Sequence, residues 1–359
     1  MKFLGSPLVL GLTILLTANT LAFANTPASD GKSFDDSDKL ERSTTVDPHA
    51  TITLCVMSGM ITVKGWDKNE VHVRSADADQ LELRRIDKTK DPASPASRID
   101  VMIFDQPNTK RDCQAQADVD LDVPISATVQ VQTREGDIRI TGVAAAYAGS
   151  QNGDITIERA TRIVEAGSVG GSISLKDSSG RVNLSSAGGG VQVTNVRPVD
   201  SEDTFDVGTV SGDIELDRVS NAKVTAKTVN GTLMMSGPLA KRGQYGFTTM
   251  SGDVVLTLPE NASFRLNAKV SDKSDIDSEF KLKEMVESAP PPPTPTSKPQ
   301  PAPQTPPKPN GGPVVAPVVV KPPIISVPYS MRRVSAMCGD GDATITVNSF
   351  GGTLRLKKS

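Results

Sequence analysis

Gly-Asp pairs are the residues of this sequence whose type and spacing could do chemistry. The aspartates of these pairs are Asp137, Asp154, Asp213, Asp253, Asp340 and Asp342. Stacked in consecutive repeat units, their carboxylates would form a column able to bind Ca²⁺ or to act as general acids and bases. In the intervening units, however, the marker glycine is followed by Ser172, Arg181, Val191 or Thr232, which interrupts the column. Aspartate is also a common turn residue, because its side chain hydrogen-bonds to nearby backbone. We therefore predict structural aspartates, with no metal site and no catalytic residue among them.

Other catalytic or metal-binding patterns are weak. The sequence has two histidines, His49 and His72, and neither has metal-ligand spacing to another histidine or to a cysteine. No G-x-S-x-G nucleophile elbow occurs. We therefore predict a protein that is not an enzyme and that needs no cofactor.

The three cysteines are Cys55, Cys113 and Cys338. Alternation along the first strand places Leu54 inward and Cys55 outward, where it could meet a loop cysteine such as Cys113. We therefore take Cys55 and Cys113 as a candidate disulfide, although connectivity is not encoded in spacing alone. Cys338 continues the inward set of Ala336, where a buried thiol is expected.

The element that must position these residues is a repeat between Val129 and Leu258. Each unit has a small or polar residue, a glycine, a polar residue, and four or five residues that alternate apolar with polar. The marker glycines are Gly136, Gly153, Gly171, Gly180, Gly190, Gly212, Gly231 and Gly252. We expect Gly136, Gly153, Gly171, Gly212, Gly231 and Gly252 in particular to be structural turn glycines, because glycine tolerates positive φ. Spacings near 10 and near 20 residues fit a rung that carries two strands and two turns.

Alternation with a period of two predicts strands and argues against helices. The residues expected to point inward together are Ile138/Ile140, Ile155/Ile157, Ile173/Leu175, Val182/Leu184, Val191/Val193, Ile214/Leu216, Val254/Leu256, Ile345/Val347 and Leu354/Leu356. One unit cannot bury its apolar stripe alone, whereas stacked units can. The sequence therefore predicts an all-β fold, an elongated β-solenoid resembling a β-helix, with a proline-rich insertion before its last strands.

The domain organisation follows from shifts in composition. Residues 1–24 have the charged start, short apolar centre and Ala22-Phe23-Ala24 site of a signal peptide. We expect a disordered lead-in at 25–48, the β-solenoid at 49–287, a proline-rich linker or insertion at 288–328, and C-terminal strands at 329–359 that return to the β domain. No apolar run of spanning length follows the signal, so no stable membrane span is expected after cleavage. The net charge of −3 carries no strong message about partners. The sequence has no basic patch interleaved with aromatics, which predicts no nucleic-acid partner.

A family resemblance rests on several stretches taken in order. These are SGMITVKGWDKNEVHVRS, repeated segments such as TVSGDIEL, the stretch GFTTMSGDVVLTLPENASFRLNAKVSDKSDIDSEF, and the closing GDGDATITVNSFGGTLRLKK. Together they resemble the bacterial putative adhesin family, exported β-strand repeat domains of unknown function. The resemblance covers roughly residues 51–357 except the proline-rich part, and it implies a β-solenoid in the cell envelope or at the surface. It brings no catalytic residues with it.

These observations predict an exported binding protein of the cell envelope or surface that acts by multivalent, non-catalytic contact. Its partner would be an envelope, glycan or protein ligand, and its destination the periplasm, the outer surface or the medium. Two alternatives remain open: a polysaccharide-active β-helix enzyme, and a structural envelope scaffold that self-associates through its solenoid ends.

Overall fold

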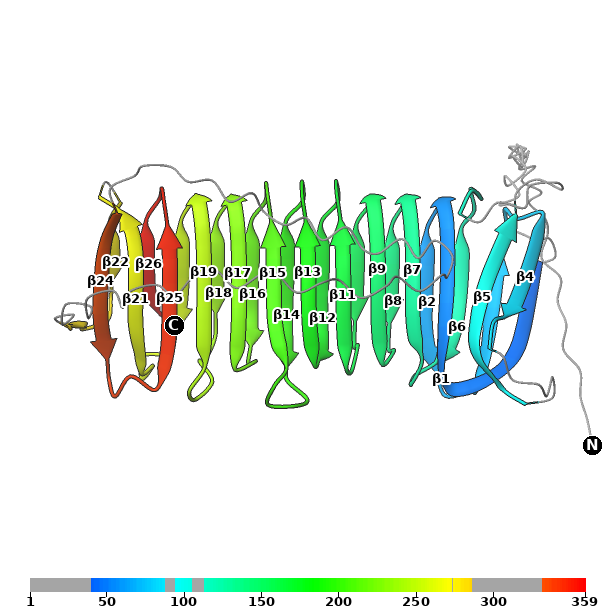
Figure 1. The fold of residues 1–359 in the computed structure, drawn as a ribbon, viewed down its shortest axis with the longest axis horizontal. Helices are drawn as coiled ribbons and strands as arrows, with labels where there is room; N and C mark the ends of the chain where they lie inside the picture. Colours follow the sequence, from blue (N-terminus) through cyan, green and yellow to red (C-terminus); the bar gives the residue numbers. More distant parts are fainter. Residues whose placement is uncertain (1–39, 88–93, 105–112, 273, 286–330) are drawn as a thin grey trace, which may run out of the picture. The chain divides into compact units, whose positions relative to one another are not determined.

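The computed structural model describes residues 40–87, 94–104, 113–272, 274–285 and 331–359. The expected signal peptide, most of the expected lead-in and the proline-rich segment lie outside these residues. All regular elements within them are strands (Figure 1). Apart from the first 38 residues, the chain forms one unit, Lys39–Ser359.

The strands of this unit alternate between two sheets, which we call sheet A and sheet B. In spatial order, sheet A contains the first part of β1 (Leu40–Ser58), β3 (Glu70–Ser75), β6 (Val119–Pro124), β2 (Ile61–Trp66), β8 (Ile138–Thr141), β10 (Ile155–Glu158), β12 (Ile173–Ser179), β14 (Val191–Arg197), β16 (Ile214–Val219), β18 (Leu233–Ser236), β20 (Val254–Leu258), β26 (Leu354–Lys358) and β22 (Ile276–Ser278).

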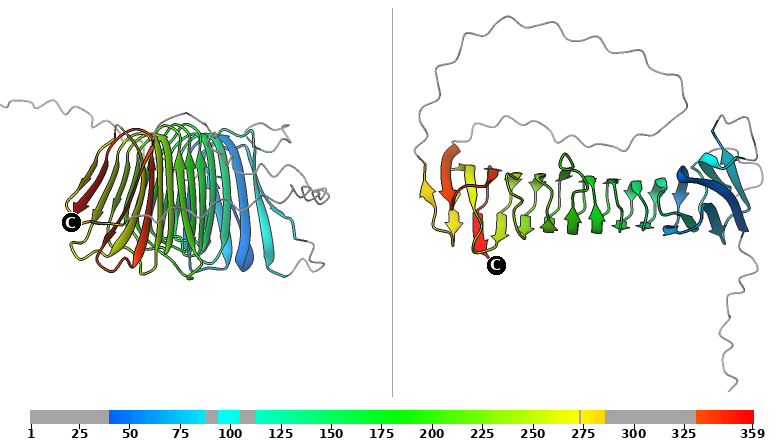
Figure 2. Two further views of the ribbon diagram at one scale, coloured as in Figure 1. Left: turned by 60° about the vertical axis from the view of Figure 1, so that its left-hand side comes forward. Right: turned by 90° about the horizontal axis from the view of Figure 1, so that it is seen from below.

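Sheet B contains, in spatial order, β4 (Gln80–Arg85), β5 (Ala96–Phe104), the second part of β1, β7 (Thr128–Glu135), β9 (Ala145–Asn152), β11 (Ile163–Ser168), β13 (Arg181–Ser186), β15 (Thr204–Thr209), β17 (Lys223–Asn230), β19 (Gln244–Ser251), β25 (Ala343–Ser349), β21 (Phe264–Ser271), β24 (Met331–Cys338) and β23 (Lys283–Glu284). Each rung therefore consists of one strand from each sheet, and the rungs stack in a row as a β-solenoid (Figures 1 and 2).

The core lies between the two sheets and is built from side chains of every rung. All the pairs that alternation assigns to the interior are buried, from Ile138/Ile140 to Leu354/Leu356. The neighbouring rungs are parallel and in register, so each buried side chain stacks on its counterpart, as Ile155 does on Ile138 and Ile173. Burial of one such side chain contributes about 1.5–3 kcal/mol. The predicted all-β solenoid is confirmed.

The order of the rungs in space differs from their order in the chain at the C-terminal end. Strand β25 lies between β19 and β21, and β26 lies between β20 and β22. The last rung of the chain, β25–β26, thus lies between β19–β20 and β21–β22 in space, although β21–β22 comes before it in the sequence (Figure 1).

The N-terminal end has the same arrangement. The second part of β1 lies between β5 and β7, and β2 lies between β6 and β8. The first rung of the chain, β1–β2, therefore lies second from its end of the stack, next to β5–β6. The last rung of the chain, β25–β26, likewise lies second from the other end, next to β21–β22. Antiparallel strands cover those terminal rungs: β4 pairs with β5, β3 with β6, and β24 with β21.

The solenoid begins earlier in the chain than its predicted start at His49. Strand β1 starts at Leu40, because Leu40–Thr45 pairs antiparallel with β3 in sheet A. The strand then crosses to sheet B, with a shift of register between Val46 and Thr51 and with Val46 and Ala50 buried at the crossing. Apolar alternation does not predict this part of the strand, because an edge strand exposes most of its side chains and residues such as Glu41 and Arg42 are polar.

Candidate functional site

A column of glycines forms the turns that lead from sheet B to sheet A. It comprises nine glycines: Gly59, Gly136, Gly153, Gly171, Gly189, Gly212, Gly231, Gly252 and Gly352. A Cβ atom on any glycine after Gly59 would lie only 2.0–2.4 Å from the carbonyl oxygen of the glycine in the rung before it. The column therefore requires glycine for close backbone approach, and positive φ is needed only at some positions, such as Gly136 and Gly252.

All six glycines named as turn glycines lie in this column, but two of the other marker glycines do not. Gly180 lies at the opposite corner, where the chain passes from sheet A to sheet B. In the run Gly188-Gly189-Gly190, the middle residue belongs to the column, and Gly190 follows it. This one-residue difference leaves Gly190 at the position that carries an aspartate in other rungs.

A column of buried hydroxyl groups supports the glycine turns from the inside. Its residues are Thr133, Ser150, Ser168, Ser186, Thr209, Thr228, Thr249 and Ser349. Most of them donate a hydrogen bond to the carbonyl of the column glycine in the preceding rung, as Ser186 does to Gly171 at 2.9 Å. The hydroxyl of Ser186 also accepts a hydrogen bond from the N–H of Gly189 at 3.0 Å. These residues were not predicted from the sequence, although the spacing Ser/Thr-x-x-Gly recurs in each of these rungs.

The aspartates that follow four of the column glycines each link their own rung to the next. The backbone N–H of Asp154 donates to the carboxylate of Asp137 at 3.0 Å, and the N–H of Ser172 donates to that of Asp154 at 2.8 Å. Asp213 and Asp253 accept in the same way from Thr232 and Thr353, at 2.7 and 2.8 Å. We call this series the aspartate column. Its hydrogen bonds run between rungs and not within one turn.

Asp340 and Asp342 do not belong to the aspartate column. They lie in the turn between β24 and β25, and their backbone N–H groups donate to the hydroxyl of Ser263 at 3.0 and 3.2 Å. The structure therefore brings four of the six Gly-Asp aspartates into one line, and Asp137 and Asp154 are the members that lie in adjacent rungs.

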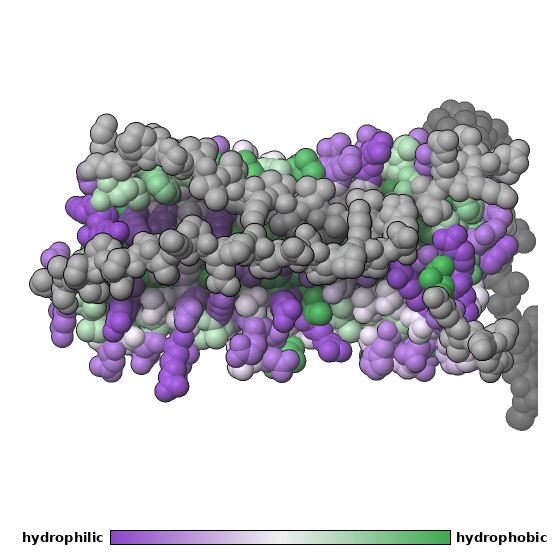
Figure 3. All heavy atoms as spheres, in the orientation of Figure 1, coloured by the Kyte–Doolittle hydropathy of each residue, from purple (hydrophilic) through white to green (hydrophobic). Residues whose placement is uncertain are grey.

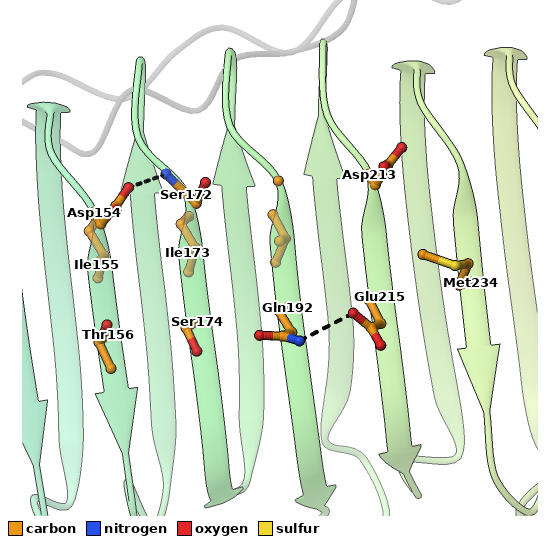
Figure 4. Close-up of a pocket in the computed structure, with 12 residues that line it drawn as sticks. Asp154, Ile155, Thr156, Ser172, Ile173, Ser174, Gln192, Asp213, Glu215 and Met234 are labelled. Carbon is orange, nitrogen blue, oxygen red and sulfur yellow. Dashed lines mark hydrogen bonds between the residues drawn. The ribbon is translucent and has the colours of Figure 1, made fainter.

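The aspartate column is interrupted at Ser172 and Gly190, and a groove of about 380 Å³ lies there on the outer face of sheet A (Figure 4). Neither residue supplies a carboxylate to the rung that follows. Among the hydrogen bonds of the described residues, the backbone N–H groups of Gly190 and Asp213 consequently have no acceptor. Two consecutive rungs therefore present free donors at this site.

The other side of the groove is a row of outward side chains in register across five strands. The row runs Thr156, Ser174, Gln192, Glu215, Met234. The amide of Gln192 donates to the carboxylate of Glu215 at 3.2 Å, and Figure 4 shows Met234 pointing toward this pair. Met234 is 37% exposed and gives the groove one apolar boundary.

The electrostatics of the groove are acidic. Asp154, Asp213 and Glu215 line it, whereas no Lys or Arg is among the described residues that do. Among all the residues that the structure describes, no group of three or more His, Cys, Asp or Glu residues could hold a metal ion. Chemically, the groove combines backbone N–H donors, hydroxyl groups, one amide and carboxylate acceptors, which is a set suited to hydrogen-bonding recognition.

Comparison with known protein families gives a match that covers residues 47–290 and is described as Toastrack DUF4097. The chain belongs to the Toastrack DUF4097 family. No curated protein matches it.

This Toastrack chain is also similar, at low sequence identity, to several solved structures. A putative adhesin from Parabacteroides merdae is 10% identical with a TM-score of 0.35, over 62% of this chain and 90% of that one. A putative adhesin from Bacteroides fragilis is 9% identical with a TM-score of 0.34, over 89% and 96%. A putative lipid binding protein from Parabacteroides distasonis is 12% identical with a TM-score of 0.33, over 62% and 91%.

The cysteines of the Toastrack chain lie away from the groove. A disulfide joins Cys55 of β1 to Cys113, which precedes β6. Cys338, at the end of β24, is a free thiol that is partly exposed and not buried as predicted from the sequence. Its sulfur donates to the carbonyl of Ala262 at 3.5 Å, and burial raises the pKa of the thiol. The described residues contain no helix long and apolar enough to cross a membrane.

Proposed function

We propose that this protein is an exported, adhesin-like binding protein of the cell envelope or surface that acts by multivalent, non-catalytic contact. The observation that carries the proposal is the strict register of outward polar side chains on parallel rungs. Residues such as Thr156, Ser174 and Gln192 recur at one position of consecutive strands, about 4.8 Å apart. A repeating ligand can contact several equivalent positions at once, and linked contacts raise the overall avidity.

Figure 3 shows hydrophilic residues gathered along the lower edge of the solenoid and at its N-terminal end, which supports contact through hydrogen bonds. The signal-peptide pattern at residues 1–24 supports export. The ligand in this proposal is an envelope glycan or protein.

The test of this function uses the chain from Asn25 to Ser359, produced by export and immobilised through a C-terminal tag. We expect the immobilised protein to retain envelope glycan or protein from fractionated cells. We also expect single molecules in solution to bind this material more weakly than molecules clustered on beads. The matched control is the same protein unfolded in urea and then alkylated. Equal retention by folded and unfolded protein, or none by either, would overturn the proposal. Fractionation of tagged cells tests the location, and recovery in the cytoplasm would contradict it.

A self-associating scaffold is the second candidate, because within the described residues the terminal strands, such as β22, pair on one side only. The last strand of sheet A, β22, pairs with β26 over only three residues, Ile276–Ser278. Short edge strands limit pairing between molecules. Light scattering across concentrations distinguishes the candidates, because a scaffold would grow with concentration while the proposed binding protein would not.

A further inference from the structure

The groove at Ser172 and Gly190 lacks a group that other rungs contain. In those rungs an aspartate carboxylate fills the space beside the turn and accepts the N–H of the following rung, as Asp154 does for Ser172 and Asp213 does for Thr232. The hydroxyl of Ser172 does not reach the N–H of Gly190, and Gly190 has no side chain to offer Asp213.

This interruption differs from the others in the aspartate column. The N–H groups of Asp137 and Asp253 also follow rungs without a carboxylate, those of Met60 and Thr232, but each is isolated between rungs whose column hydrogen bonds are intact. Only at Gly190 and Asp213, within the described chain, do two free donors occur in consecutive rungs, and the groove opens beside them. A ligand with two suitably spaced oxygens could accept both.

The spacing of the donors restricts the chemistry of that ligand. Consecutive rungs lie about 4.8 Å apart. Carbonyl groups on one side of an extended peptide recur every second residue, about 6.6 Å, and do not match this spacing. Equatorial oxygens on alternate carbons of a six-membered sugar ring are separated by about one rung spacing and do match it.

The remaining groups of the groove fit hydroxyl groups that donate as well as accept. Asp154, Glu215 and Gln192 offer acceptor oxygens, and Thr156 and Ser174 offer hydroxyl groups of either kind. The three carboxylates of the groove would repel an anionic sugar such as a uronate. The lining has no aromatic ring, so affinity per site depends on hydrogen bonds.

We propose that the groove between Asp154 and Met234 binds a neutral or amine-bearing linear oligosaccharide, whose equatorial hydroxyl or glycosidic oxygens on alternate ring carbons take the place of the missing carboxylates and accept the N–H groups of Gly190 and Asp213. This inference rests on the proposed binding function and names the ligand class of one site. The sugar chain runs across the strands along the solenoid, with Met234 as its apolar boundary.

Two substitutions close the site with groups that neighbouring rungs already accommodate. Ser172→Asp places a carboxylate against the N–H of Gly190, and Gly190→Asp places one against the N–H of Asp213. A Cβ at Gly190 would lie 3.2 Å from the carbonyl oxygen of Asp213, so Gly190→Asp needs a small adjustment of the backbone. Ser172→Asp needs no such adjustment, because residue 172 is not a glycine and already has a Cβ atom. The matched control is Thr232→Asp, which adds a carboxylate to the same column outside the groove.

The probes are hexamers of 1,4-linked glucose, N-acetylglucosamine, glucosamine and galacturonate, titrated calorimetrically into the exported full-length chain. We expect binding of at least one neutral or amine-bearing hexamer, weaker binding of galacturonate, and a loss of affinity of at least about tenfold in Ser172→Asp and Gly190→Asp. Thr232→Asp should bind as the wild type does. Thermal unfolding should show that all three variants remain folded.

Three results would overturn the inference. One is failure of every hexamer to bind wild-type protein that still retains envelope material, which would leave the proposed function standing. Another is equal affinity in wild type and Ser172→Asp. The third is binding of a lysine-containing extended peptide, and of no hexamer, with sensitivity to Ser172→Asp. Loss of all binding to envelope material would instead contradict the proposed function itself.

Discussion

The backbone N–H of Thr353 donates a hydrogen bond of 2.8 Å to the carboxylate of Asp253, a residue 100 positions earlier in the chain. The same carboxylate lies 3.4 Å from the guanidinium of Arg355. One side chain thus adds two polar contacts to the strand pairing that holds the last rung, β25–β26, in the stack.

Removal of this carboxylate should loosen the last rung. We expect Asp253→Ala to lower the free energy of unfolding by about 1–2 kcal/mol, because a charge-assisted hydrogen bond is lost, whereas the exposed ion pair adds little. Hydrogen exchange should be faster at the N–H of Thr353. Asp277→Ala, at an exposed position of β22, is the control and should change neither quantity. Unchanged exchange at Thr353 would refute this role of Asp253.

The glycine column predicts a large contrast between two glycines of similar surroundings in sequence. A Cβ at Gly171 would lie 2.0 Å from the carbonyl oxygen of Gly153, whereas a Cβ at Gly149 would meet only the Cγ atom of Gln132, at 3.7 Å. We expect Gly171→Ala to destabilise the fold by more than about 3 kcal/mol, because the rungs cannot approach. Gly149→Ala should be neutral or slightly stabilising. Urea unfolding measures both, and similar midpoints would show that close approach is not required.

The hydroxyl column predicts a contrast between neighbouring serines. Ser186 makes two hydrogen bonds in the interior, to Gly171 and Gly189, while Ser185 faces outward on the same strand. Ser186→Ala should cost about 1–3 kcal/mol, because the partly buried carbonyl of Gly171 and the buried N–H of Gly189 lose their partner. Ser185→Ala should stay within about 0.5 kcal/mol of wild type. Equal stability of the two variants in thermal unfolding would argue against a supporting role for the hydroxyls.

The disulfide between Cys55 and Cys113 closes a segment of 58 residues. Its removal in Cys113→Ala should lower the free energy of unfolding by about 2–4 kcal/mol, because the unfolded chain gains freedom. Reduction of the wild type should have the same effect, and Cys338→Ala should not. A thiol count of one per native, unreduced chain checks the pairing directly, and three would contradict it.

The thiol of Cys338 should react slowly in the folded protein. Its pKa is raised, chiefly by burial, so less thiolate is present at any pH below that pKa than in the unfolded chain. Alkylation by iodoacetamide should therefore accelerate at a higher pH in native protein than in protein unfolded by urea. Coincident pH profiles would show that the fold does not shield the sulfur.

The interior of this fold was predictable because alternation acts over a few residues. Pairs such as Ile173/Leu175 face inward wherever a strand forms, and that rule needs no knowledge of neighbours. The adhesin-family resemblance and the solenoid prediction agree with the Toastrack match and the observed rungs.

The turn chemistry was less accessible, because it depends on which residues stack. Nothing in the composition of Gly188-Gly189-Gly190 identifies Gly189 as the column residue, although its spacing from Ser186 would have done so. The free N–H groups of Gly190 and Asp213 could be identified only from the stacking order of the turns, in which Ser172 and Gly190 follow Asp154. The insertion of β25–β26 before β21–β22 was not predictable either, because parallel pairing between distant segments leaves no local pattern.

That insertion has a consequence for the order in which the molecule can be made. Ribosomes release the N-terminal part of a chain first, so β21 and β22 emerge before the strands that separate them from β19 and β20. Until β25 and β26 are synthesised, the intended neighbours of β21 and β22 do not exist. The stack can therefore be closed only by a finished chain, and a chain that stops short of Leu354 leaves a gap inside the molecule, not a shorter end.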